Sequence, residues 1–340
     1  MDGIEQFFGA HFRAKANRIQ SYDYIEDFIA RSHIDWSTAP NTAKVVEAFI
    51  REISALPATE FTFLVAHSGY IPEVYEADSS QETLYSKLIE TVVLEWAIRM
   101  GFPESRLPTQ KASMEDVSIL DGEHVIVCDA KSFRLGRSQG APNVKDVLKH
   151  ADIEKWLSAY QTEEKLGGLV AFPSQHDWKK GSDFYQYTTD KSSPTASLYY
   201  EHLAFFLVAE KSSEDLINLY RNYADLFPKK ITKAQNNRAR YYLQVEEYLF
   251  SNEQKLWEEF KATAEKIVSE RVFHCVHRLD KHLTEVREEI VIRYSHETDI
   301  EKLRAMAIEA EYAKATDDLH KQQKRIHNFR SVSDGYHEED

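Results

Sequence analysis

Two acidic residues and a lysine stand close together around a predicted β-hairpin. Asp116 precedes a first run of Val and Ile, and Asp129 and Lys131 lie at the end of a second run. Mg²⁺ prefers oxygen ligands and usually takes one or two carboxylates, with water and phosphate oxygens completing its shell. A lysine beside them can orient a water molecule and offset charge on a reacting phosphate. These residue types therefore suit metal-assisted hydrolysis of a phosphodiester bond.

The hairpin that would position them surrounds a two-residue turn at Asp121 and Gly122, because a type I′ turn needs positive φ at both positions. Folding the chain there pairs Asp116 with Val127. Asp116 and Asp129 then become diagonal neighbours, roughly 7–8 Å apart at the backbone, so that one ion can contact both carboxylates. The other face of the hairpin is apolar and carries Val117, Ile119, Ile126, Cys128 and Ala130. The pattern alone leaves open a solvated hairpin end with a surface ion pair.

A long helix is predicted before the hairpin, from Ser79 to Met100, with Gly101 ending it. Ser79 and Glu82 fit a capping box, in which the two side chains satisfy amides that have no partner inside the helix. This capping role is enough to explain Glu82, and the residues alone favour it over a role in a metal site. The apolar face of the helix carries Leu84, Leu88, Val92, Trp96 and Met100.

The remaining pattern predicts a mixed α/β chain with a large helical C-terminal part. Helices are expected over 4–56 with breaks, over 144–161, around Tyr199 and His202, and over most of 212–329; a buried strand is expected over 167–172. Residues 60–66 fit either a helix or a strand. The predicted regions are an N-terminal helical region 1–70, a catalytic core 71–210, a helical region 211–330 and a disordered tail 331–340.

Composition points to a soluble intracellular protein. Hydrophobic residues make up 42% and charged residues 29% of the 340 residues, and Cys128 and Cys275 are the two cysteines. No apolar run reaches the roughly 20 residues that cross a bilayer, and the start of the chain does not read as a signal peptide. The net charge of −14 argues against a general affinity for nucleic acid. Residues 131–149, however, carry five basic residues and one acid, which is a local footprint for phosphate.

Sequence motifs resemble the HindIII family of type II restriction endonucleases, within the PD-(D/E)XK nuclease superfamily. They are SSQETLYSK at Ser79–Lys87, DAKSFRLGR at Asp129–Arg137, EHLA at Glu201–Ala204 and FPKK at Phe227–Lys230, in matching order and spacing. The resemblance runs from about Tyr70 to past residue 300. It implies a restriction-endonuclease-like core, in which a mixed sheet is flanked by helices.

The resemblance also implies an activity and its partners. We expect Mg²⁺-dependent cleavage of palindromic double-stranded DNA by a homodimer in the bacterial cytoplasm, with Mn²⁺ able to substitute and with 5′-phosphate ends. A methyltransferase that marks the same site would be its functional partner in the cell. By position, the metal-site acids of the family fall on Glu82, Asp116 and Asp129, and its lysine falls on Lys131. The match at Asp116 is less direct, because the connection between the two aspartates is a little shorter.

DNA contacts are expected near the catalytic strand. Arg134, Arg137 and Lys145 suit phosphate, and Ser132 suits a water molecule. Asn and Gln side chains suit adenine, and Arg and Lys suit guanine. The plausible base-reading residues are Gln139, Asn143, Gln175 and Gln186. The family resemblance implies AAGCTT as the recognition site, so it is the first site to test. The residues of this sequence do not by themselves establish the recognition site.

Other interpretations remain open. A repair or mobile-element nuclease could use the same core. Residues 252–330 could instead form a partner-binding scaffold with no nuclease activity. His274, Cys275 and His277 hint at a transition-metal site but have no clear fourth ligand. His202 is expected to pack inside a helix.

Overall fold

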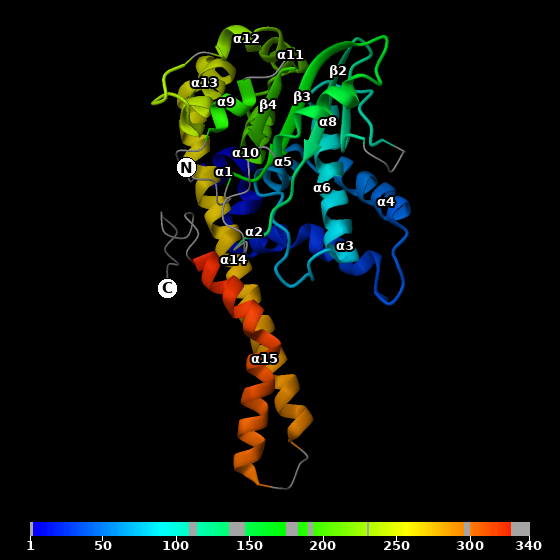
Figure 1. Ribbon diagram of the computed structural model, residues 1–340, viewed down its shortest axis with the longest axis vertical. Helices are drawn as coiled ribbons and strands as arrows, with labels where there is room; N and C mark the ends of the chain where they lie inside the picture. Colours follow the sequence, from blue (N-terminus) through cyan, green and yellow to red (C-terminus); the bar gives the residue numbers. More distant parts are fainter. Residues whose placement is uncertain are drawn as a thin grey trace.

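The computed structural model has a body built on a helix-covered sheet, from which a long helical hairpin projects (Figure 1). It describes residues 3–108, 114–135, 147–174, 183–189, 193–229, 231–295 and 300–327. The mixed α/β class expected from the sequence is confirmed, as is the long helical C-terminal region.

Short helices build the N-terminal region and cover one side of the body. They are α1 (Gly3–Phe8), a 3₁₀ turn (Ala10–Arg13), α2 (Lys15–Tyr22), α3 (Tyr24–Ser32), α4 (Thr42–Ser54) and α5 (Ala58–Ala66). The segment that the sequence left undecided is therefore helical. All but one of the residues from Phe61 to Ala66 are hydrophobic and all six are buried, which is why periodicity could not assign them.

The long helix α6 (Ser80–Arg99) forms as expected, with the Ser79 side chain accepting a hydrogen bond from the Glu82 amide over 3.2 Å. Gly101 follows the helix with a φ of 96°, a conformation that glycine adopts readily. The later helices of the body are α8 (His150–Leu157), α9 (Phe184–Thr189), α10 (Tyr200–Val208), α11 (Ser213–Arg221), α12 (Tyr223–Leu226) and α13 (Arg238–Phe250).

A mixed sheet lies at the centre of the body. Its strands are β1 (Val117–Leu120), β2 (His124–Ala130), β3 (Glu164–Phe172) and β4 (Thr195–Tyr199), in spatial order β1-β2-β3-β4. β1 and β2 are antiparallel, whereas β3 runs parallel to both β2 and β4. The strand β4 and the helix α9 were not predicted from the sequence. β4 is a short buried strand that runs directly into α10 without a turn residue, so no break separates the two elements.

The hairpin register differs from the prediction by two residues. Val117 pairs with Cys128 and Leu120 with Val125, so the connection has four residues and the predicted two-residue turn is wrong. The Asp121 carboxylate accepts hydrogen bonds from the amides of Glu123 and His124, and this local arrangement replaces the type I′ turn. A shift of two residues leaves every side chain on its predicted face.

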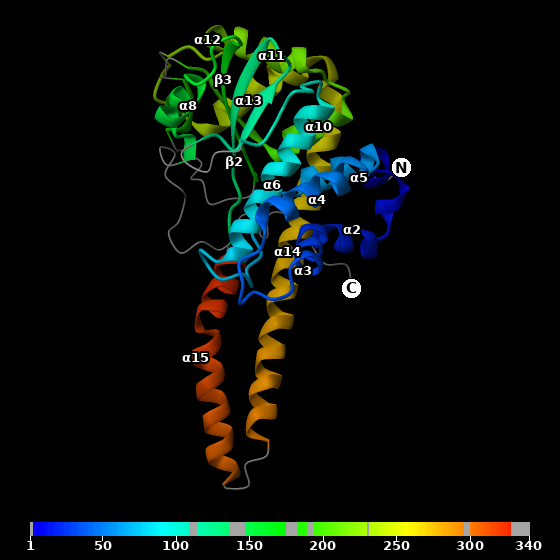
Figure 2. The ribbon, with the colours of Figure 1, turned by 90° about the vertical axis from the view of Figure 1, so that its right-hand side faces the viewer.

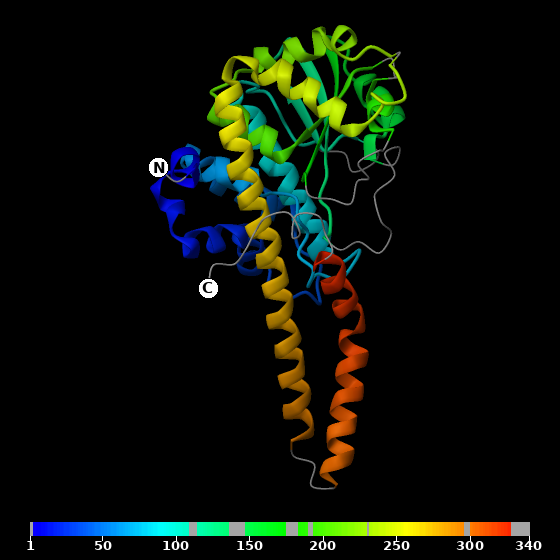
Figure 3. The ribbon, with the colours of Figure 1, turned by 90° about the vertical axis from the view of Figure 1, so that its left-hand side faces the viewer.

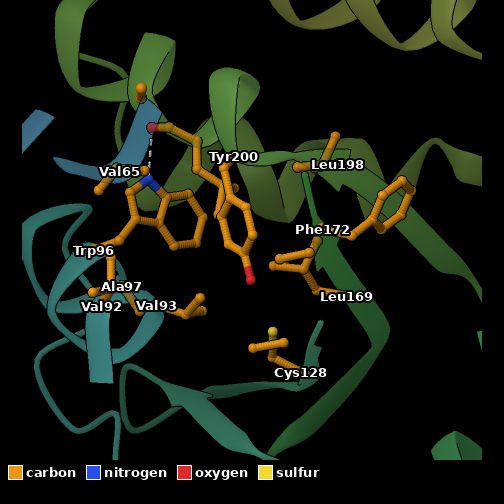
Figure 4. Close-up of a cluster of buried hydrophobic side chains, with 14 of the residues drawn as sticks. Val65, Val92, Val93, Trp96, Ala97, Cys128, Leu169, Phe172, Leu198 and Tyr200 are labelled. Atoms are coloured by element: carbon orange, nitrogen blue, oxygen red, sulfur yellow. Dashed lines mark hydrogen bonds between the residues drawn. The ribbon is translucent and has the colours of Figure 1, made fainter. Parts of the chain in front are cut away.

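Helices cover both faces of the sheet. Tyr200 of α10 lies between Trp96 of α6 and the strand residues Cys128 and Leu169 (Figure 4). The Trp96 indole donates to the Leu203 carbonyl over 2.9 Å. Gly168 points to the opposite face, since side chains alternate along a strand. There α8 packs so closely that a Cβ on Gly168 would lie 2.7 Å from Ile153.

The projecting hairpin consists of α14 (Gln254–Tyr294) and α15 (Glu301–His327), which run side by side in both side views (Figures 2 and 3). The first half of α14 lies along the body. Val268 and Val272 in this half, together with Leu279 further along the helix, form an apolar cluster with Tyr70 and Leu135. None of the described helices is long and apolar enough to cross a membrane.

Candidate functional site

Three of the four predicted catalytic residues, Asp116, Asp129 and Lys131, meet at the carboxyl end of β2. The Lys131 ammonium forms an ion pair with the Asp129 carboxylate, with 2.6 Å between Nζ and Oδ2, and both side chains are largely buried. The Asp116 carboxyl accepts a hydrogen bond from the Ala130 amide over 2.9 Å. Continuing the observed register by one residue places Asp116 opposite Asp129, so the two aspartates are closer than the predicted diagonal arrangement.

The main chain of Lys131 is held from two sides. Its amide donates to the Ala171 carbonyl of β3 over 2.7 Å, and its carbonyl accepts a hydrogen bond from the Tyr200 hydroxyl over 2.9 Å. Two residues further on, the Phe133 amide donates to the Gly69 carbonyl over 2.8 Å. The lysine therefore stands on a backbone fixed by the sheet, by α10 and by the segment before α6.

The electrostatics of Asp116 are those of a crowded acidic site. Its pKa is raised from 3.8 to about 8, chiefly by burial and in addition by the charges of Glu90 and Asp129 and a hydrogen bond with Asp129, while Lys131 opposes the shift. Like charges held together disfavour the ionised form. Such clustering in a protein is typical of a functional site that a cation completes.

Glu90 of α6 is a member of this cluster that the sequence reasoning missed. Its side chain is 8% exposed, and burial raises its pKa to about 7, with Asp129 adding to the rise and Lys87 and Lys131 opposing it. The Lys87 ammonium pairs with the Glu90 carboxylate over 2.5 Å. The available signal was an acid inside an apolar run of the helix, KLIETVVLEW, where a carboxylate is costly unless it has a partner.

Glu82 occupies a different place. Its carboxylate accepts a hydrogen bond from the Asp78 amide over 2.7 Å and forms an ion pair with Arg134 over 3.0 Å. Arg134 also donates to the carbonyls of Pro72 and Glu76. The Ser79 half of the predicted capping box is therefore formed, whereas the Glu82 side chain binds the amide of Asp78 and not that of the capping residue. Arg134 has structural partners. The metal role of Glu82 and the phosphate role of Arg134 stay predictions.

Few of the expected DNA contacts fall on described residues. The Ser132 hydroxyl is buried and has no hydrogen-bond partner among the described residues, so its contact with a water molecule stays a prediction. Gln186 exchanges hydrogen bonds with Asn236 over 3.1 and 3.0 Å. The other expected contacts lie outside the described residues; they are Arg137, Gln139, Asn143, Lys145 and Gln175.

The donor set suits Mg²⁺, although its oxygens are engaged in other contacts. No group of three or more His, Cys, Asp or Glu side chains within the described ranges is arranged to hold a metal ion. Asp116 and Asp129 share a hydrogen bond, and lysines pair with Asp129 and Glu90. Mg²⁺ needs only one or two carboxylates beside water and phosphate, so the aspartate pair can hold it once their shared proton leaves.

The other candidates have structural roles in the described part of the chain. His202 is buried and stacks on Tyr199, with 5.1 Å between the ring centroids, as its predicted packing role requires. His274 pairs with Asp23 over 2.9 Å, and Cys275 is buried in an apolar cluster.

Comparison with known proteins identifies the family of the chain. The chain is 30% identical over 213 residues to the type II restriction enzyme HindIII of Haemophilus influenzae, and the match covers 58% of this chain and 64% of that enzyme. It therefore spans a little less than two thirds of the relative. Residues 32–314, most of the chain, match the sequence profile of HindIII restriction endonucleases. The chain belongs to the HindIII restriction endonuclease family.

Proposed function

We propose that the protein is a type II restriction endonuclease that hydrolyses phosphodiester bonds in palindromic duplex DNA with Mg²⁺, on a core of the PD-(D/E)XK kind. The observation that carries the proposal is the group of Asp116, Asp129 and Lys131 at the carboxyl end of β2, in a chain of the HindIII family. AAGCTT is the first recognition site to test, because the chain is similar to the restriction enzyme HindIII.

Each residue of the candidate site has a role in this proposal. Asp116 and Asp129 would hold Mg²⁺, with Glu90 or the predicted Glu82 as a third acid. The cation, when bound, supplies Lewis acidity to the phosphate and lowers the pKa of a water molecule. Lys131 orients that water and offsets negative charge on the phosphate as the leaving oxygen departs. The main-chain bonds of Lys131 to Ala171 and Tyr200 keep the ammonium in place without reorganisation.

The partners follow from the substrate. A palindromic site has twofold symmetry, so a homodimer would place one active site on each strand. A methyltransferase with the same recognition site would protect the DNA of the cell.

Incubation of the purified protein with phage DNA and Mg²⁺ tests the proposal. Discrete fragments are the expected result, and sequencing their ends gives the recognition site and the position of the cut. A smear would favour a less specific nuclease on the same core. Intact DNA at all Mg²⁺ and Mn²⁺ concentrations would favour a helical scaffold.

A further inference from the structure

We infer that Lys87 is a second basic residue of the catalytic site: it pairs with Glu90 in the metal-free protein and contacts a backbone phosphate of DNA once a divalent cation takes that carboxylate. This inference rests on the proposed nuclease function. It assigns to Lys87 a contact with substrate, beyond the acids and the single lysine that the family resemblance predicts.

The course of α6 places Lys87 between Glu82 and Glu90, beside the residues that follow the end of β2. Near the start of the helix, Glu82 pairs with Arg134, which follows the catalytic strand. Further along, Glu90 lies within electrostatic reach of Asp116, Asp129 and Lys131. The helix therefore runs past the end of β2. With a rise of about 1.5 Å per residue, Lys87 lies about 4.5 Å from Glu90 along the axis, on the way to Glu82 and thus level with the segment after Lys131.

Lys87 and Lys131 differ in how far their side chains are exposed to solvent. The Lys131 side chain is 19% exposed and its partner Asp129 is 5% exposed, so this pair lies inside the protein. Lys87 is 45% exposed, whereas Glu90 is 8% exposed. Lys87 thus covers a buried carboxylate from the solvent side, where a bound duplex would approach. Its flexible four-carbon stem allows the ammonium to turn from the carboxylate to a nearby anion.

The charges of the site explain why a bound cation would release Lys87 from Glu90. Glu90 is too buried to remain ionised without a positive partner. In the metal-free protein Lys87 is that partner. In the proposed exchange, a divalent cation held by Asp116 and Asp129 would take its place beside Glu90. When Asp116, Asp129 and Glu90 are all ionised, they carry three negative charges. One divalent cation together with Lys87 and Lys131 carries four positive charges, so the site keeps a net charge of +1. A phosphodiester group of DNA carries one negative charge and would neutralise this site. The Lys87 ammonium, released from Glu90, is then free to contact that phosphate.

A second basic residue on the same helix has a purely structural arrangement. Arg99 pairs with Glu95 over 2.7 Å and also donates to the carbonyls of Ile53 and Leu56, which ties α6 to the N-terminal helices. Lys87 has no such anchor, since its partner within the described residues is Glu90. An ammonium with one replaceable partner is suited to exchange.

The test measures how salt weakens DNA binding, which counts phosphate contacts independently of the cleavage rate. Each lost contact reduces the slope of log Kobs against log[KCl] by about 0.9. Binding is measured from 50 to 200 mM KCl on a labelled duplex carrying the site cut by wild type. One series contains Ca²⁺ in place of Mg²⁺, and the other contains EDTA and no divalent cation. Gel electrophoresis checks that the duplex is uncut, and only intact duplex is included in the binding measurement. In Ca²⁺, Lys87→Gln is expected to lower the slope by about 0.9 and Lys87→Arg to keep it. In EDTA, Lys87→Gln is expected to match wild type.

Lys165→Gln is the matched control, because Lys165 is an exposed lysine at the other end of β3, opposite Val125. Its slope should equal that of wild type in both series. A wild-type slope for Lys87→Gln in Ca²⁺ would overturn the inference, and so would an equal fall in EDTA, since the lysine would then reach DNA without a cation. Failure of the wild-type protein to cut DNA at all would instead overturn the proposed function.

Discussion

The Tyr200 hydroxyl donates a hydrogen bond to the main-chain carbonyl of Lys131 over 2.9 Å. Tyr200 is the first residue of α10 and is fully buried between α6 and the sheet (Figure 4). Its ring also lies so close to Gly69 that a Cβ there would come within 2.5 Å of it. One buried side chain thus connects the start of α10 and the segment before α6 with the backbone of the proposed catalytic lysine.

Tyr200→Phe should reduce the single-turnover cleavage rate about tenfold or more, because a small misplacement of Lys131 weakens its contact with the reacting groups. Loss of the hydrogen bond should also cost about 1–2 kcal/mol of stability. Tyr220→Phe is the matched control, since the Tyr220 hydroxyl donates to the Gly168 carbonyl over 2.8 Å, away from the site. It should lose similar stability and keep its rate. Equal rates for the two variants would limit Tyr200 to a structural role.

Asp129→Ala and Lys131→Ala should each lose at least about three decades of cleavage rate, the scale on which removal of a key metal ligand or charge-stabilising group is felt. DNA binding should survive in Lys131→Ala, because the lysine acts mainly on the reacting phosphate. Rates on phage DNA and binding of a duplex check the two effects separately. Near-normal cleavage by either variant would remove the residue from the active site.

The third acid can be identified by comparing Glu90→Gln with Glu82→Gln. Glu90→Gln should raise the Mg²⁺ concentration needed for half-maximal cleavage, because Glu90 lies in the field of Asp116 and Asp129. Glu82→Gln should keep its Mg²⁺ requirement and lose a little stability with the Arg134 ion pair. Mg²⁺ titrations and melting curves in EDTA measure both. The opposite result would give Glu82 the metal role that the family resemblance predicts for it.

The sequence was informative where local rules decide the structure. The Ser79 cap, the end of α6 at Gly101, and the placement of Asp116 on the face of Asp129 and Lys131 all follow from neighbouring residues. The hairpin register was not predicted correctly. The Asp121 carboxylate holds a four-residue connection in place of the two-residue turn that Asp-Gly normally favours.

The remaining errors concern contacts between residues distant in sequence. Glu90 belongs to the site because α6 runs past the end of β2, and no spacing within α6 contains that information. β4 and its parallel pairing with β3 depend in the same way on tertiary packing. Tyr200 was one apolar residue of a predicted helix, and only its position above Lys131 gives it a role.

A homodimer is expected in solution, with the helical hairpin contributing to the interface. Exposed apolar side chains gather near its far end, where Ile292 is 65% and Met306 62% exposed. Sedimentation should give twice the monomer mass, and the double variant Ile292→Ser with Met306→Ser should dissociate more readily. Ile34→Ser is the control, because Ile34 is 86% exposed but lies in the N-terminal region. A monomer both free and on cognate DNA would contradict the dimer.

Asp116 and Glu90 should each lower the stability of the metal-free protein as pH rises from about 4 toward 8, against the opposite contribution of His67, whose pKa burial lowers to about 3. In the folded state Asp116 keeps its proton up to a pKa of about 8 and Glu90 up to about 7, whereas both ionise near 4 when the chain unfolds. Between these values the native state binds more protons at these two groups than the unfolded state, so their contribution favours unfolding as pH rises. Glu73 and Glu201, whose pKa values burial raises to about 7, add to the same slope.

Asp116→Asn separates the contribution of the site from that of the other acids. In EDTA, its melting temperature should fall less steeply with pH than that of wild type, and Glu201→Gln should flatten the slope similarly. Metal binding distinguishes the two variants. Mg²⁺ needs the ionised carboxylate, so wild type and Glu201→Gln should release protons when they bind it near pH 7, which calorimetry in buffers of different ionisation enthalpy detects. Asp116→Asn should release fewer, and unchanged proton release in this variant would show that Asp116 is not a ligand.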